Sequence, residues 1–85
     1  MNKTLVRQYH QAIENEVSTT RYMRDDYKDN GWKFSDGFKD YVDGVIAGIA
    51  RGFETICRIS FDFETADYIQ CHNAKIRNRM KKIMG

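Results

Sequence analysis

The chain has 85 residues, a net charge of +2 and a composition that is 31% charged and 41% hydrophobic. This length allows one small domain, residues 1–85, with a thin core that buries only about 60–65% of the unfolded surface. No segment resembles a signal peptide, and the most apolar run, 42–59, contains four charged side chains, which excludes a transmembrane span. The sequence therefore predicts a soluble cytoplasmic protein with reduced cysteines.

Charge is unevenly distributed along the chain. Every charged side chain after Asp67 is basic, whereas residues 1–67 hold more acids than bases. These basic residues are Lys75, Arg77, Arg79, Lys81 and Lys82. A basic end is typical of a contact with nucleic acid or an anionic surface. It is also typical of a solvated helix end, where cations complement the helix dipole.

The first predicted element is an amphipathic helix over residues 4–28. Apolar side chains recur there at a spacing of three and four residues, and the chain contains no proline. The sequence Asp29-Asn30-Gly31 is a helix stop, with a glycine suited to the left-handed conformation after the last turn. We expect residues 29–35 to connect two helices, with Ser35 or Asp36 capping the second.

The second predicted helix, residues 36–60, has the clearest periodicity in the chain. Phe38, Val42, Val45 and Ile49 begin an apolar stripe that continues at the same spacing to Ile56. The end of this helix is ambiguous, because residues 55–63 also alternate between apolar and polar side chains, as a strand does. Such a strand would find a partner only by strand exchange in a dimer.

The third predicted element is a helix over residues 63–84, with Asp62 as its cap and Asn73 interrupting its apolar stripe. The apolar phase of the second helix continues into this segment with little slip, so one helix of nearly fifty residues is an alternative. We predict instead a bend or turn near residues 60–63. The expected fold is all-α: a three-helix bundle, or a helical hairpin with a long central helix, that self-associates.

Three glycines, Gly44, Gly48 and Gly52, lie four residues apart in the most apolar part of the chain. In a helix they share one face, and each costs about 0.8–1 kcal/mol relative to alanine. Close approach by another backbone would offset that cost. Three occupants are possible: a helix of the same chain, a second copy of the protein, or a flat ligand.

Aromatic residues concentrate between residues 22 and 41 and alternate with basic residues. Tyr27, Trp32 and Phe34 are the candidates for partner binding, because aromatic side chains with basic neighbours anchor proteins or stack on bases. The alternative is that the loop folds Trp32 and Phe34 over the open end of a thin core. An exposed Trp32 would favour the binding interpretation.

No arrangement of residues predicts catalysis, a cofactor or a metal site. Cys71 and His72 are adjacent and point about 100° apart in a helix, so they are poorly placed to hold one ion. His10 and Glu14 form an i, i+4 pair, which is an ordinary helix-surface contact. We expect a non-enzyme.

The function predicted from the sequence is that of a small accessory or regulatory protein that binds a protein partner. Its size would suit a modulator of a host complex encoded by a phage or mobile element, an inference from class rather than from residues. The alternatives are a nucleic-acid binder that uses the basic third helix, and a small-ligand binder at an oligomer interface. Binding to phosphates would weaken steeply with salt, which separates the first alternative from a protein interface.

Overall fold

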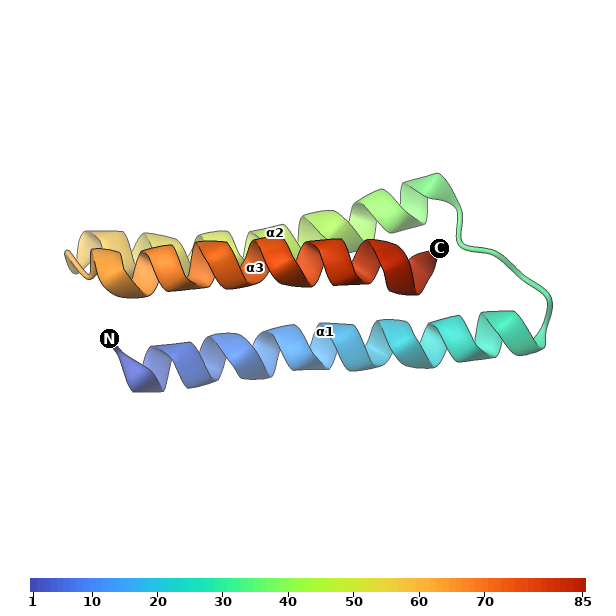
Figure 1. Ribbon diagram of the computed structural model, residues 1–85, viewed down its shortest axis with the longest axis horizontal. Coiled ribbons are helices and arrows are strands. Elements are labelled where there is room, and N and C mark those ends of the chain that lie inside the picture. Colours follow the sequence, from blue (N-terminus) through green and yellow to red (C-terminus); the bar gives the residue numbers. More distant parts are fainter.

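The computed structural model describes all 85 residues, and most of them form three long helices that lie side by side in alternating directions (Figure 1). The helices are α1 (Lys3–Asp29), α2 (Asp36–Ile59) and α3 (Phe63–Met84). The molecule measures 48 × 20 × 15 Å. The predicted all-α three-helix fold is confirmed, and the turn near residues 60–63 is present. The strand interpretation of residues 55–63 and the single helix of nearly fifty residues are both wrong, because the chain stays helical to Ile59 and then reverses.

Each helix begins with a side-chain cap. Asn2, Ser35 and Asp62 each accept a hydrogen bond from the main-chain N–H three residues later. These bonds satisfy N–H groups that have no partner within the helix. Hydrogen bonds from Thr65 also hold the pKa of Asp62 below its usual value. The main-chain N–H of Asn2 in turn donates to Thr65 Oγ1 at 3.0 Å, which joins the start of α1 to the start of α3.

The end of α1 follows the sequence prediction closely. Gly31 has a φ of 71°, in the left-handed region. Its N–H donates to the Lys28 carbonyl at 3.2 Å, and the Trp32 N–H donates to the Tyr27 carbonyl at 2.8 Å. This pair of bonds is a Schellman motif, which uses glycine because a Cβ is disfavoured there. It also fixes where Trp32 leaves the helix.

The end of α2 has the same geometry with a different residue. Phe61 takes the left-handed position, with a φ of 57°, and 81% of its surface is exposed. The Phe61 N–H donates to the Arg58 carbonyl at 3.1 Å, and the Asp62 N–H donates to the Cys57 carbonyl at 2.8 Å. For residues other than glycine, this left-handed conformation costs about 1–2 kcal/mol of free energy. The turn is therefore strained at an exposed phenylalanine.

A continuous apolar core runs along the inside of the bundle. It consists of Leu5, Tyr9, Ile13 and Val17 from α1, Val42, Ile46, Ala50 and Cys57 from α2, and Ala66, Ile69, Ile76, Met80 and Met84 from α3. The core positions recur at helical spacing, but in α2 they are not the predicted stripe. Of that stripe only Val42 is buried, whereas Val45 is partly exposed and Ile56 is exposed, because α2 turns the neighbouring face with Ile46, Ala50 and Cys57 inward. The α2–α3 hairpin has the most extensive contact, and α1 packs against both of its helices.

A small polar network lies within this core and explains why Asn73 interrupts the apolar stripe of α3. The Asn73 amide donates to the Ile46 carbonyl at 3.0 Å and to the Tyr9 hydroxyl at 3.3 Å. The same hydroxyl lies 2.9 Å from His72 Nδ1, and the His10 ring stacks edge-on against His72 with ring centroids 4.5 Å apart. No buried side-chain polar atom lacks a hydrogen-bond partner. The network thus joins all three helices.

Phe61→Gly is expected to stabilise the protein by about 1 kcal/mol, because glycine adopts the left-handed conformation without the Cβ penalty. The measurement is the free energy of unfolding from urea denaturation at low protein concentration. Phe61→Ala is the matched control, since it removes the exposed ring but keeps the Cβ. A gain as large in Phe61→Ala as in Phe61→Gly would contradict backbone strain as the cause.

Stability is expected to fall as the pH decreases from 7.5 to 5. Burial lowers the pKa of His72, and the neighbouring His10 ring acts in the same direction. The unfolded chain therefore binds a proton at His72, with a pKa near 6.5, before the folded chain does. The stability that depends on uncharged His72 is fully present above about pH 6.5. It is lost as the pH falls toward the lower pKa that His72 has in the folded protein.

Thermal denaturation at pH 7.5, 6.5, 5.5 and 5.0 measures this effect, with His72→Gln as the comparison. The variant should show a smaller fall in melting temperature over this range. Asp43 and Asp62 also have lowered pKa values, but those carboxyls lose their contribution only below about pH 4. An equal fall in both proteins would show that His72 is not responsible.

Candidate partner-binding site

Aromatic side chains gather where the α1–α2 connection meets the end of α1 and the start of α2. The Tyr27 ring packs edge-on against Trp32, with 5.4 Å between ring centroids. It lies at a shallow tilt of 30° against Phe34, with centroids 4.7 Å apart. Phe34 then stacks on Phe38 at 5.2 Å. Phe34 is half-buried against the core, whereas 57% of Trp32 is exposed. The structure brings the three predicted residues together, and only Phe34 covers the end of the core.

A cleft of about 520 Å³ opens beside this cluster, which we call the aromatic cleft. Its apolar part consists of Tyr27, Trp32, Phe34 and, from α3, Met84. Its charged lining consists of Arg24, Lys28, Lys33 and Lys39, with no acidic side chain. The end of α3 completes one wall, so residues far apart in the sequence form a single concave surface.

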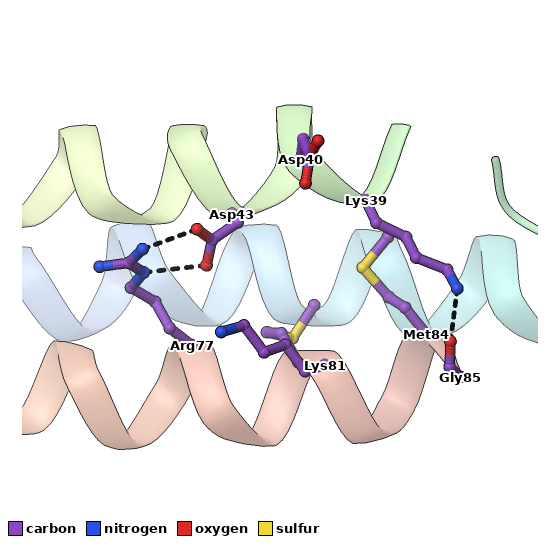
Figure 2. A pocket seen from close by; sticks show the side chains of 8 residues that line it. Lys39, Asp40, Asp43, Arg77, Lys81, Met84 and Gly85 are labelled. Carbon is purple, nitrogen blue, oxygen red and sulfur yellow. Dashed lines mark hydrogen bonds and ion pairs between the residues drawn. The ribbon is translucent and has the colours of Figure 1, made fainter. Parts of the chain in front are cut away.

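The four cations of the aromatic cleft differ in how they are held. Arg24 is tied to the neighbouring Asp25 by two hydrogen bonds, at 3.0 and 3.2 Å. Lys39 donates to the main-chain oxygen of Gly85 (Figure 2). Lys28 and Lys33 are exposed and form no ion pair. These two lysines are therefore free to meet an anionic group.

A second concavity, of about 330 Å³, lies between α2 and α3 next to the aromatic cleft. Figure 2 shows Arg77 of α3 reaching Asp43 of α2 with two parallel bonds, of 2.8 and 2.7 Å. The hydrogen bonds from Arg77 hold the pKa of Asp43 below its usual value. Such a bidentate pair is a strong contact between two helices. Arg77 therefore helps to hold α3 against α2.

The five predicted basic residues of α3 do not form one surface. Arg77 and Lys81 face α2, where both line the concavity with Asp40 and Asp43. The other three follow a separate stripe, at the i, i+4 and i+7 positions Lys75, Arg79 and Lys82. The structure therefore divides the five basic residues into a pair that faces α2 and an exposed stripe of three.

The glycines of α2 face away from the core. A Cβ added to Gly44, Gly48 or Gly52 would meet no heavy atom within 4 Å. The interpretation that these three glycines allow close packing within the monomer is therefore wrong. The cost of three interior glycines, about 3 kcal/mol, has no compensation within the chain.

The remaining candidate ligands are dispersed. No group of three His, Cys, Asp or Glu side chains gathers in the structure. Cys57 is buried, and burial raises the pKa of its thiol, whereas Cys71 is exposed. His10 and His72 belong to the internal network and bond to Tyr68 and Tyr9. None of the three helices is both long and apolar enough to cross a membrane.

Sequence reasoning missed part of the aromatic cleft. Met84 and Gly85 come from the far end of the chain, and nothing local connects them to Trp32. The signal that could have placed them is the similar length of the three predicted helices. When such helices pack in alternating directions, the end of the third lies beside the connection between the first two. Arg24 and Lys39 were visible in the sequence as basic neighbours of the aromatics.

Comparisons with protein-family models, with curated proteins and with solved structures found no match to this chain.

Proposed function

We propose that this protein is a non-enzymatic binding module, an accessory or regulatory protein that captures a protein partner in the aromatic cleft. The partner segment is acidic and carries at least one large apolar side chain. The single observation that carries the proposal is Trp32, which is mostly exposed yet held against Tyr27 beside unpaired lysines.

The aromatic part of the cleft supports a protein partner. Tryptophan and tyrosine supply large contact areas at low entropic cost and dominate the energetics of many interfaces. Contacts with Tyr27 and the Schellman turn hold Trp32 in place before any partner arrives. A preorganised side chain loses little freedom on binding, so more of its contact energy appears as affinity.

The charge of the cleft supports an acidic partner. Lys28 and Lys33 lie at its edge without a counter-ion, and the lining has no carboxylate side chain. Exposed cations at an interface rim accelerate association and select against basic partners. The apolar side chain of the partner would supply affinity, and its carboxylates would supply orientation.

A second candidate function is nucleic-acid binding through Lys75, Arg79 and Lys82. These exposed side chains share one stripe of α3. Three phosphate contacts would give weak and strongly salt-dependent binding. The stripe carries no exposed aromatic side chain for base stacking, so the aromatic cleft is the stronger candidate.

Binding in the cleft can be followed by the fluorescence of Trp32, because it is the only tryptophan in the chain. We would titrate the protein with a set of glutamate-rich peptides that each carry one phenylalanine, tryptophan or leucine. Polyglutamate of equal length and a single-stranded oligonucleotide are the comparison ligands. We expect a shift of Trp32 emission with the apolar-bearing peptides and little with polyglutamate.

Trp32→Ala should weaken peptide binding by about 2 kcal/mol or more, roughly thirtyfold, as measured by calorimetry. Tyr22→Ala is the matched control, since Tyr22 is an exposed aromatic of α1 outside the cleft. The pair Lys28→Glu and Lys33→Glu should weaken binding more than Lys75→Glu and Lys82→Glu, which change the net charge equally. The proposal is wrong if the α3 pair has the larger effect or if Trp32→Ala binds normally.

A further inference from the structure

The outward face of α2 is uncharged and apolar over most of its length. It contains Tyr41, Gly44, Val45, Gly48, Gly52, Thr55, Ile56 and Ile59, and the partly buried Ile49 lies at its edge against the core. Tyr41 is 67% exposed and Ile59 is 74% exposed. Every charged residue of α2 lies outside this arc at helical spacing. The face extends over about 27 Å at 1.5 Å per residue. We call it the glycine face.

The glycine face is flat at its centre and bordered by larger side chains. A shallow hollow of about 330 Å³ lies over Gly48 and Gly52, and it is bordered by Ile49, Phe53 and Ile56 of α2 and by Ala12 of α1. Because no atom of the chain lies within 4 Å of a Cβ built at either glycine, the space directly above the glycines is open to another helix. Small residues at this spacing allow two backbones to approach closely, an effect of sterics alone in water.

We propose that the occupant of the glycine face is the same face of a second copy, packed antiparallel about a two-fold axis at Gly48. In this register Gly48 meets its own equivalent, and Gly44 of each copy lies opposite Gly52 of the other. A two-fold interface of this kind uses one patch twice, so an uncharged face is complementary to itself.

The charges at the two ends of the face favour this register, whereas Arg51, on the same edge near the centre, lies about 9 Å along the axis from Arg51 of the other copy. Asp40 and Arg58 lie on the same edge of the glycine face, near its two ends, because 18 residues equal five helical turns. The antiparallel two-fold brings like edges together, so Asp40 of each copy lies within about one turn of Arg58 of the other. Within one chain the two residues are about 27 Å apart along α2 and cannot pair. Asp40 forms no ion pair in the monomer.

The parallel arrangement lacks these contacts. It would put Asp40 of the two copies at the same level and on opposite sides of the contact. It would also align the two helix dipoles, whereas the antiparallel pair opposes them. A contact between one pair of helices is small compared with the roughly 800 Å² per partner of a standard interface. We therefore expect a weak dimer that forms at micromolar concentrations and above.

Sedimentation equilibrium from about 5 to 500 micromolar tests the dimer. Gly48→Leu should raise the dissociation constant at least about tenfold, because the side chain fills the closest approach of the two helices. Asn78→Leu, which adds the same side chain at an exposed position of α3, is the matched control and should leave association unchanged. Circular dichroism verifies that both variants are helical.

A charge exchange tests the register. Asp40→Arg should weaken the dimer by about three- to tenfold, since two symmetric pairs are lost. Combining it with Arg58→Asp should restore association to near the starting value. Arg58 also lies 3.9 Å from Glu54 in its own helix, so both single variants are measured for stability as well.

Three results would overturn the proposal. A monomer at every concentration would show that the glycine face does not bind a second copy. A dimer unaffected by Gly48→Leu would place the interface elsewhere. A dimer weakened by Gly48→Leu, but not restored when Arg58→Asp is added to Asp40→Arg, would exclude the antiparallel register. Since none of these residues lines the aromatic cleft, the outcome is independent of the peptide titration.

Discussion

The hydrogen bonds of one buried side chain, Asn73, link all three helices inside the apolar core. Its amide donates to the main chain of α2 at Ile46 and to the Tyr9 hydroxyl of α1. A buried amide that lost these partners would cost about 1–3 kcal/mol, so rotations or slips of either helix are penalised. Polar groups in helical cores fix register in this way at some cost in stability. With α2 held at Ile46, its glycines are turned outward. With α1 held at Tyr9, its far end reaches the level at which α3 ends.

Much of the fold could be predicted from local signals. The caps Ser35 and Asp62, the stop at Gly31 and the periodicity of each helix all depend on residues close in sequence. The end of α2 was harder, because no glycine is present and the alternating pattern of residues 55–63 competes with the helical one. The Schellman turn at Phe61 is set by the need of α2 and α3 to pack, and that need overrides the preference of the residue.

The candidate site was predictable in part for a related physical reason. Tyr27, Trp32 and Phe34 are close in the chain, so their clustering needed only a turn at Gly31. The separation of Arg77 from Arg79 follows from helix geometry, but the partner of Arg77 depends on which face of α2 lies opposite. The outward direction of the glycines depends on the same long-range choice. Apolar side chains on α2 cover more than half of its circumference, so periodicity alone leaves two inward orientations open.

Phe61 and the glycine face share a property that the monomer does not explain. Each lowers the stability of the isolated chain, one through backbone strain and the other through helix propensity. Natural proteins depart from local preferences mainly where function requires it. The aromatic cleft lies at the opposite end of α2 from Phe61, and the glycine face lies between them. An antiparallel dimer would therefore carry its two aromatic clefts at opposite ends. A partner with two acidic segments would gain avidity only if the chain between those segments spanned the length of the dimer.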